Sequence, residues 1–144
     1  MPERFKSVAC VDIIIKKIVN NKTSILLMKR KNTGSHDGEY DLPGGHLEKE
    51  EDLFSAMMRE TKEELLIDLK REEINLIYLL HHYSGERLNF IFETNGEELK
   101  PQIGEPDKCS ELRWVDLADL PEETTPKVKL IISDILEGKK YNKL

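Results

Sequence analysis

The segment from Ser7 to Ile15 constrains the fold more than any other, because nearly all of its residues are apolar and many are β-branched. Such a run predicts a β-strand with both faces largely buried. A polar turn at 19–23 separates it from a second apolar run at 24–28, so the two runs predict a β-hairpin. We expect further strands at 74–80, 88–93 and 112–115.

Two segments have the apolar spacing of helices, at 52–66 and 127–136. The strands therefore surround one central helix along the chain, and this order predicts a mixed α/β or α+β sandwich. The tail from about 138 to 144 follows the second helix, and we expect it to be frayed. No repeat or linker divides the chain, so its 144 residues are expected to form one domain spanning 1–144.

The composition excludes several classes of function. No apolar run approaches the ~20 residues of a membrane span, and the first residues lead into no signal-peptide core, so we expect a cytoplasmic protein without a membrane partner. The formal net charge of −6 argues against general binding of a nucleic-acid polymer, which needs a basic surface. Cys10 and Cys109 lack a metal or redox spacing, and we expect both to be free thiols.

The helix predicted at 52–66 carries a dense group of acidic residues. Glu60, Glu63 and Glu64 fall within one arc of it, because positions three and four apart share a helix face. Like charges at this spacing destabilise a helix by about 0.2–0.5 kcal/mol per pair, so their convergence favours the binding of a divalent cation. The alternative is a solvated acidic face on a surface helix.

Gly44 and Gly45 precede this helix by a few residues. Two glycines allow the backbone to turn tightly, to approach a ligand closely and to direct a carbonyl group toward a metal. The chain has no Walker loop, no GxGxxG motif and no Ser-His-Asp signature. The glycine pair together with the spaced acids favours a metal-dependent site over an ordinary turn.

The spacing of these residues resembles the Nudix box, G-x5-E-x7-R-E-U-x-E-E-x-G-U, in which U is an aliphatic residue. The matching residues are Gly45, Glu51, Arg59, Glu60, Glu63, Glu64 and Ile67. Thr61 stands where an aliphatic residue is usual, a change that should matter little on a partly buried helix face. Leu66 replaces the glycine after the helix, and because glycine best adopts a left-handed cap, we expect this helix to end differently.

The resemblance extends along most of the chain. Residues 42–48 and 105–114, followed by Leu120-Pro121, look like the MutT-related branch of nucleoside triphosphate pyrophosphohydrolases. The resemblance implies an α+β fold, an α/β/α sandwich with a mixed central sheet on which the Nudix-box helix packs. It also implies an enzyme that hydrolyses a nucleoside diphosphate linked to a group X, most specifically a nucleoside triphosphate to monophosphate plus pyrophosphate.

The resemblance assigns a metal site and its supports to the box helix. The implied ligands are Glu60, Glu63, Glu64 and the Gly44 carbonyl, and the implied ion is Mg²⁺, for which Mn²⁺ can substitute. Glu63 and Glu64 thereby also belong to the implied catalytic residues. Arg59 is expected to orient the glutamates by ion pairing, and Glu51 to hold Arg59 or to bind the metal through water.

The general base and the phosphate contacts have weaker signals. Glu105 is the candidate base, the alternatives being that it is only a turn residue before Pro106 or that Glu111 takes the role. His46 invites a substrate-binding role, and we expect it at the mouth of the site or in local packing. Arg30, at the end of its strand, could contact phosphates.

Aromatic residues bear on the choice of substrate. Tyr83 and Phe90, like Tyr78 and Trp114, could stack on a base, although aromatic residues on strands usually pack in the core. Tyr83 follows Ile67 by 16 residues, a spacing that resembles that of dinucleoside polyphosphate hydrolases. No proline stands at that position, which disfavours the ADP-ribose type.

A rival function from another class is a non-catalytic Nudix domain that senses a nucleotide or binds a protein. Such domains typically lose glutamates of the box, whereas all four are present here, so the sequence favours the enzyme. The expected partner is a small-molecule nucleotide, and an exposed strand edge would permit a homodimer.

Overall fold

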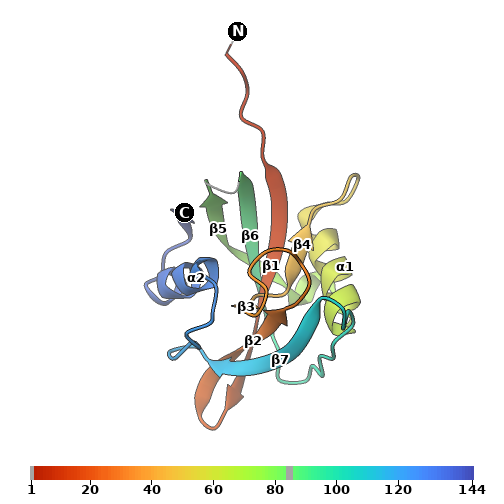
Figure 1. Ribbon diagram of the computed structural model, residues 1–144, viewed down its shortest axis with the longest axis vertical. Helices are drawn as coiled ribbons and strands as arrows, with labels where there is room; N and C mark the ends of the chain where they lie inside the picture. The colour runs from red at the N-terminus through yellow and green to blue at the C-terminus, as the bar shows by residue number, and fades with distance from the viewer. Residues whose placement is uncertain (1, 84–85) are drawn as a thin grey trace.

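Eight strands form one mixed sheet in the computed structural model, which describes residues 2–83 and 86–144. The sheet is the middle layer, and one helix lies on each side of it, as Figure 1 shows. In chain order the elements are β1 (Val8–Val19), β2 (Lys22–Arg30), β3 (Tyr40–Asp41), β4 (Gly44–His46), α1 (Leu53–Leu65), the 3₁₀ turn η1 (Arg71–Glu73), β5 (Asn75–His82), β6 (Arg87–Asn95), β7 (Cys109–Asp116), α2 (Pro126–Leu136) and β8 (Tyr141–Lys143). The predicted α+β sandwich is confirmed.

Strand β1 runs through the middle of the sheet and pairs along both of its edges. One edge pairs in parallel with β6 over the whole span 8–16. The other edge pairs antiparallel with β4 at 10–12 and with β2 at 16–19. Asn20 and Asn21, both with positive φ, connect β1 to β2, which suits a tight hairpin turn. The predicted hairpin is confirmed.

Alternate residues of β1 are buried on opposite faces of the sheet, as the apolar run predicts. On the α1 side, Val11 and Ile13 belong to a core that includes Met57 and Leu65 of the helix. On the α2 side, Ile14 belongs to a second core that includes the apolar residues of α2. Both helices are therefore held to the sheet mainly by the burial of apolar side chains.

The sheet face toward α2 is apolar over only part of its length. Ile14 of β1 and Ile91 of β6 belong to the core beneath α2. Two residues earlier on the same two strands, and on the same face, stand Asp12 and Asn89, which are also buried. The floor of this face thus changes from apolar to polar close to the start of α2.

Helix α1 begins and ends at well-defined caps. The Asp52 side chain accepts a hydrogen bond from the Ser55 backbone N–H at 2.8 Å, which caps the first turn. At the other end, Leu66 has φ 56° and ψ 37°, and its N–H donates to the Lys62 carbonyl. The prediction that this helix ends differently is wrong, because the leucine itself adopts the left-handed cap. That conformation costs a residue with a Cβ about 1–2 kcal/mol.

The C-terminal tail is ordered, and the prediction that it is frayed is wrong. β8 pairs in parallel with β5 at the edge of the sheet. The Leu79 N–H donates to the Lys140 carbonyl at 3.0 Å, and the Leu144 N–H donates to the His81 carbonyl at 3.0 Å. The open edge of β5 supplies these hydrogen-bonding groups, and the composition of the tail gives no sign of them.

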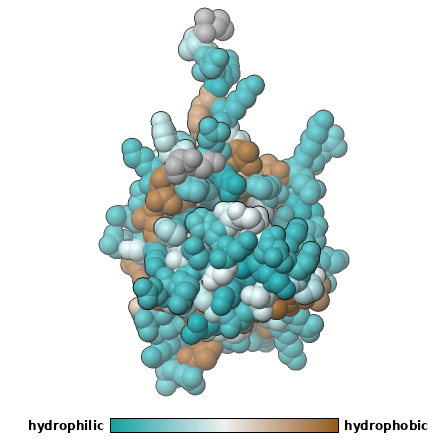
Figure 2. Space-filling view, in the orientation of Figure 1, coloured by the Kyte–Doolittle hydropathy of each residue, from teal (hydrophilic) through white to brown (hydrophobic). Residues whose placement is uncertain are grey.

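The surface is strongly polar. Figure 2 shows a face covered mainly by hydrophilic side chains, with small apolar patches and with the N-terminal residues projecting from one end. Within the two described ranges, no helix is long and apolar enough to cross a membrane. Cys10 and Cys109 are both buried and free, as the sequence predicts.

Candidate active site

Two glutamates of α1 lie partly buried against strand β4. Burial raises the pKa of Glu64 to about 9, and repulsion from Glu60 adds to that effect. Burial also raises the pKa of Glu60, although the neighbouring Arg59 opposes the shift. The Gly44 N–H donates a hydrogen bond of 2.9 Å to Glu64 Oε1. These carboxyl groups are therefore held in a place where their negative charge is costly.

The glycine pair makes this close approach possible. A Cβ atom on Gly45 would lie 2.2 Å from Glu60 Oε1, and one on Gly44 would lie 2.2 Å from the Val11 carbonyl oxygen. A side chain at either position would therefore displace the strand or the glutamate. The sequence predicted close approach to a ligand here, and the structure shows close approach to the carboxylates themselves.

Arg59 forms ion pairs with several glutamates around this site. Its Nε and Nη2 atoms donate to the two carboxylate oxygens of Glu51 at 3.1 and 2.9 Å. Its Nη1 atom lies 3.0 Å from Glu60 Oε1 and 3.4 Å from Glu63 Oε2. Nη2 also donates to the His46 carbonyl at 3.0 Å. The forked bond from Arg59 lowers the pKa of Glu51, and this geometry agrees with the orienting role expected for the pair.

The loop before β7 brings a fourth carboxylate to the end of α1. The Gly104 N–H donates to the Glu64 carbonyl at 2.8 Å, and the Gln102 N–H donates to the Leu65 carbonyl at 2.9 Å. A Cβ atom on Gly104 would lie 2.1 Å from the Glu63 carbonyl oxygen, so the loop approaches as closely as a glycine permits. Glu105 follows directly, and its charge contributes to raising the pKa of Glu64.

Glu60, Glu63, Glu64 and Glu105 together form what we call the acidic cluster. Among the described residues, Glu64 has no ion-pair partner, whereas Arg59 pairs with Glu60 and Glu63, and Lys108 lies 3.8 Å from Glu105. Closely spaced carboxylates with little compensating charge suit a hard divalent cation, which prefers oxygen ligands. As the side chains stand, no three His, Cys, Asp or Glu residues in 2–83 and 86–144 are grouped tightly enough to hold a metal ion. Side-chain rotation on α1 would therefore accompany metal binding.

The other candidate base is engaged elsewhere. Glu111, on β7, accepts a hydrogen bond from the Tyr40 hydroxyl group. Glu105, by contrast, lies 3.8 Å from Lys108 Nζ and about two-thirds buried, and its charge acts on Glu60 as well as on Glu64. The structure thus brings Glu105 to the acidic cluster and leaves Glu111 in a separate contact.

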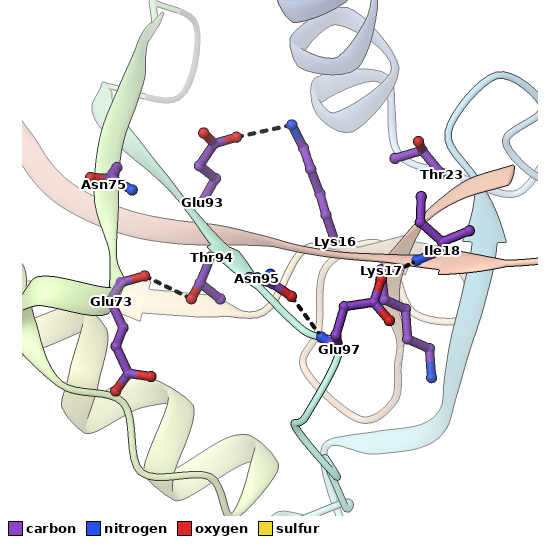
Figure 3. Close-up of a pocket in the computed structure, with 10 residues that line it drawn as sticks. All are labelled: Lys16, Lys17, Ile18, Thr23, Glu73, Asn75, Glu93, Thr94, Asn95 and Glu97. Atoms are coloured by element: carbon purple, nitrogen blue, oxygen red, sulfur yellow. Dashed lines mark hydrogen bonds and ion pairs between the residues drawn. The ribbon is translucent and has the colours of Figure 1, made fainter. Parts of the chain in front are cut away.

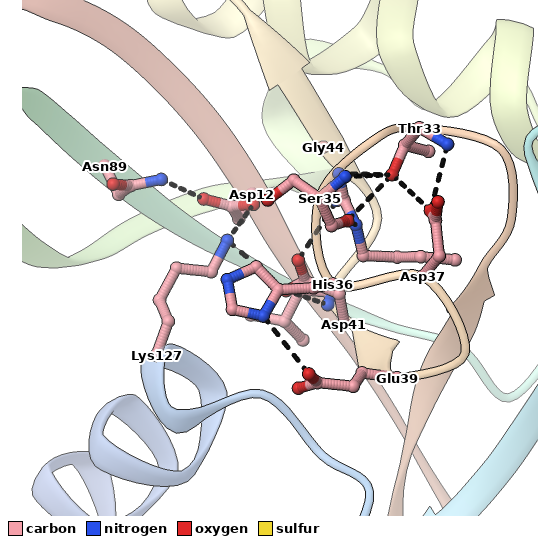
Figure 4. A network of polar contacts seen from close by, with 12 residues as sticks. Asp12, Thr33, Ser35, His36, Asp37, Glu39, Asp41, Gly44, Asn89 and Lys127 are labelled. Carbon is pink, nitrogen blue, oxygen red and sulfur yellow. Dashed lines mark hydrogen bonds and ion pairs between the residues drawn. The ribbon is translucent and has the colours of Figure 1, made fainter. Parts of the chain in front are cut away.

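A pocket of about 320 Å³ opens on the other side of β4, beside the start of α2. We call it the α2 pocket. It is lined by Arg30, Ser35, His36, Asp41, His82, Arg87, Asn89, Thr125, Pro126, Lys127 and Leu144. Figure 4 shows the polar contacts around it, where Lys127 at the start of α2 reaches down to Asp12. The polar half of the sheet floor described above therefore forms part of this pocket.

Two cations of the α2 pocket, Lys127 and Arg30, are paired with aspartates. Lys127 Nζ lies 3.3 Å from both Asp12 Oδ1 and Asp41 Oδ1, and Arg30 Nη1 lies 3.3 Å from Asp41 Oδ2. Burial lowers the pKa of Lys127, but attraction to the two aspartates outweighs it and leaves that pKa raised. Burial raises the pKa of Asp12, and the lysine opposes that shift. Sequence reasoning missed this network, although a single aspartate in the apolar run 7–15 was a usable signal.

Gly44 connects the acidic cluster with the α2 pocket. Its N–H bonds to Glu64 on one side, while Asp12 is its β1 partner and places Oδ1 within 2.6 Å of the position where a Cβ would stand. Asp12 also contributes to the raised pKa of Glu64. One short strand therefore separates the two regions, and a ligand in the pocket would have its near end beside the acidic cluster.

The four residues predicted to bind substrate lie in different environments. Arg30 lines the α2 pocket, with its guanidinium held by Asp41 and by the Ser35 carbonyl. His46 is exposed on β4, next to the acidic side. Phe90 packs against the core on the α1 side, opposite to Asn89 and the pocket. Tyr83 is 68% exposed and contacts the His81 ring at 5.2 Å between centroids.

A second hollow, of about 470 Å³, lies at the far end of β1 and β6 (Figure 3). Its polar groups bond to one another: Lys16 pairs with Glu93 at 2.9 Å, and Thr94 donates to the Glu73 carbonyl at 2.8 Å. Glu97 accepts from the Ile18 N–H at 2.7 Å. The α2 pocket is the better candidate, because Gly44 connects it to the acidic cluster, whereas this hollow is lined by no residue of that cluster.

Comparisons with known proteins agree with this architecture. The family model for the NUDIX domain matches residues 10–134. An ADP-ribose pyrophosphatase of Methanocaldococcus jannaschii is 31% identical over 127 residues, which cover 83% of this chain and 70% of that protein. The structure of a MutT NUDIX hydrolase from Burkholderia pseudomallei has a TM-score of 0.76 at 27% identity and covers 90% of this chain and 98% of its own. The NUDIX domain of Shewanella oneidensis NrtR, solved with ADP ribose, has a TM-score of 0.75 at 19% identity, covers 92% of this chain and 88% of its own, and shows the fold alone.

Proposed function

The chain belongs to the NUDIX family, and from this premise we propose that it hydrolyses the diphosphate of a nucleoside diphosphate linked to a sugar, with ADP-ribose as the first candidate. The observation that carries the proposal is the adjacency of the acidic cluster and the α2 pocket across Gly44. A nucleoside in the pocket would direct its diphosphate toward the carboxylates. The curated relative at 31% identity supports the choice of ADP-ribose.

The proposed reaction is a hydrolysis of one phosphoric anhydride bond. Water attacks one phosphorus atom, the bridging P–O bond breaks, and ADP-ribose yields AMP and ribose 5-phosphate. We assign to Glu105 the acceptance of the proton that the attacking water loses, because it is the only cluster member on a loop and faces both Glu60 and Glu64. Arg59 would hold Glu60 and Glu63 in place, with Glu51 fixing the guanidinium.

The proposed cofactor is Mg²⁺, with Mn²⁺ as a substitute. Glu60 and Glu64 would hold it, with Glu63 and the Gly44 carbonyl as further ligands, and the four neighbouring carboxyl groups, which include Glu64 without an ion-pair partner among the described residues, support this assignment. When bound, such an ion supplies charge neutralisation for phosphoryl transfer and makes a water molecule more acidic. Glu63, whose side chain is 50% exposed, is the ligand with most freedom to turn toward an ion.

A nucleoside triphosphate is the second candidate substrate, with monophosphate and pyrophosphate as products. The structural similarity at 27% identity to a MutT NUDIX hydrolase supports it, as does the sequence resemblance to that branch. Position 83 is a tyrosine and not a proline, which also favours a triphosphate over ADP-ribose. This observation opposes the one from the similarity to the ADP-ribose pyrophosphatase. Tyr83 itself supports a dinucleoside polyphosphate only by its spacing, because its ring lies on an exposed strand end.

A substrate panel tests the proposal. ADP-ribose, nucleotide sugars, nucleoside triphosphates and dinucleoside polyphosphates would be ranked by kcat/KM in Mg²⁺, with products separated by chromatography. We expect ADP-ribose at the top, and ¹⁸O from labelled water in one of its two products. A triphosphate at the top would replace the substrate and keep the reaction. Measurable binding without turnover of any nucleotide would refute the enzyme and favour the sensor.

A further inference from the structure

Asn89 occupies an unusual position for an amide side chain. It lies in the interior of β6, is only 3% exposed, and forms part of the floor of the α2 pocket. Its Nδ2 group donates to Asp12 Oδ2 at 2.9 Å. Its Oδ1 atom is buried without any hydrogen-bond partner. An unpaired buried acceptor costs about 1–3 kcal/mol, so a partner at this atom would be strongly favoured.

The direction of this amide is fixed by its neighbours. Both oxygens of Asp12 accept hydrogen bonds, Oδ1 from Lys127 Nζ at 3.3 Å and Oδ2 from the Asn89 amide at 2.9 Å. If the amide of Asn89 turned over, its oxygen would face the carboxylate oxygen, and the bond to Asp12 would be replaced by repulsion. The Asn89 oxygen is therefore held away from Asp12, and it is the unpaired acceptor that this side chain contributes to the lining of the α2 pocket.

A second unpaired group lies on the wall of the same pocket. Thr125, the residue before α2, is 2% exposed, and its hydroxyl oxygen has no hydrogen-bond partner. It lines the α2 pocket together with Asn89 and Lys127. Lys127, Arg30 and Asp41 of this pocket are paired with one another or with Asp12, whereas these two buried atoms have no partner and mark where a ligand can supply one.

We propose that Asn89 is a specificity residue that selects nucleotides by a hydrogen-bond donor on the nucleoside, the donor being a base amino group or a ribose hydroxyl group. The inference rests on the proposed function in one respect, namely that the nucleoside occupies the α2 pocket. Thr125 adds a hydroxyl group that can donate to a neighbouring acceptor of the same ligand. A ligand that offers a carbonyl or a C–H group to Asn89 leaves its oxygen unpaired and binds more weakly.

Matched pairs of nucleoside monophosphates test this inference by titration calorimetry, with no need for hydrolysis. AMP and IMP differ in the 6-amino group, and AMP differs from 2′-deoxy-AMP and 3′-deoxy-AMP in one hydroxyl group. We expect AMP to bind at least about tenfold more tightly than its partner in one of these pairs. A difference between AMP and IMP would assign the donor to the base, and a difference between AMP and a deoxy-AMP would assign it to the sugar. Equal affinities in all three pairs, or no binding of AMP, would overturn the inference.

Variants at position 89 connect the preference to this side chain. Asn89→Leu, close to asparagine in size, should lower the affinity for AMP to that for the other nucleotide of the pair. The affinity for that other nucleotide should stay unchanged. Asn89→Ser, which is smaller, gives a second reading if the leucine impairs folding. Asn75→Leu, an exposed asparagine on β5, is the matched control and should keep the preference. A preference that persists in both position-89 variants would refute the assignment.

The outcome is separable from that of the proposed function. If the wild-type protein distinguishes the pair but hydrolyses no nucleotide, the inference stands and the hydrolase proposal falls. If it hydrolyses ADP-ribose but treats all three pairs alike, the hydrolase proposal stands and the role of Asn89 is refuted.

Discussion

Two groups of carboxylates, one buried and one partly buried, lie on opposite sides of strands β1 and β4, and they differ in how their charge is balanced. Beneath α2, Asp12 and Asp41 share Lys127, and Asp41 also pairs with Arg30. On α1, the described part of the chain gives Glu64 no cation, and the pKa of this residue is raised to about 9 by burial and by Glu60. Both aspartates beneath α2 are thus paired with a cation, whereas Glu64 on α1 has none among the described residues.

The difference separates a structural role from a ligand-binding role. A buried ion pair within the protein fixes the shape of its surroundings, and breaking it leaves a buried charge. Carboxylates without such a partner raise the free energy of the folded protein until an external cation binds. We infer that the balanced group shapes the α2 pocket, and that the acidic cluster is held ready for a metal ion. The predictions below test this contrast, in descending order of size.

The largest effect is expected from removing the shared cation. Lys127→Met would leave Asp12 buried and unpaired, so the free energy of unfolding should fall by about 3 kcal/mol, as measured by urea denaturation. Arg30 still pairs with Asp41, which keeps the loss at the lower end of the usual range. Lys129→Met, two residues along on the exposed side of α2, should change stability little. Equal losses in both variants would contradict the balanced-charge account.

The opposite pattern is expected from neutralising the acidic cluster. Glu64→Gln keeps the shape and removes a carboxyl group that the folded protein accommodates only by binding a proton or at a cost in charge, so the melting temperature should hold or rise in metal-free buffer. Yet kcat should fall by at least about 10²-fold, because charge stabilisation dominates phosphoryl transfer. Glu63→Gln should lower kcat similarly.

Glu50→Gln, in the loop before the helix, is the matched control and should leave kcat unchanged. Near-wild-type rates for Glu63→Gln and Glu64→Gln would refute the site. A fall in the melting temperature of Glu64→Gln would instead show that its charge is balanced in the fold.

The loop that carries Glu105 provides a test of intermediate size. Gly104→Ala would place a Cβ 2.1 Å from the Glu63 carbonyl oxygen, so the loop must move and Glu105 with it. We expect kcat to fall about tenfold, since small displacements of a reacting group are costly. The affinity for AMP should stay unchanged, because the α2 pocket lies on the other side of β4. A loss of AMP affinity with kcat intact would reverse the roles of the two regions.

The smallest effect is expected at the end of α1, from a substitution that changes no charge. Leu66→Gly should raise the free energy of unfolding by about 1 kcal/mol, because the leucine stands in a left-handed conformation that glycine adopts without strain. The metal requirement should be unchanged, since the cap follows the carboxylates. Urea denaturation and an Mg²⁺ titration of activity check the two parts, and a changed metal requirement would show that cap and site are coupled.

Local patterns in the sequence predicted the elements but not how they meet. The apolar run of β1, the hairpin and both helices follow from periodicity, and Gly45, Glu60 and Glu64 follow from their spacing. The α2 pocket depends on Lys127 meeting Asp12 across 115 positions, a contact that no local pattern contains. Leu66 shows the same limit, because it adopts a left-handed backbone conformation that its residue type disfavours.

Direct titration of Mg²⁺ into the metal-free protein tests the central claim most closely, with binding followed by calorimetry. The account predicts that the wild-type protein binds Mg²⁺, that Glu64→Gln weakens this binding at least about tenfold, and that Asp41→Asn, in the balanced group, leaves it unchanged. Bound Mg²⁺ should also raise the melting temperature of the wild-type protein more than that of Glu64→Gln. Equal affinity in Glu64→Gln, or a loss of affinity in Asp41→Asn, would contradict the division between the two groups of carboxylates.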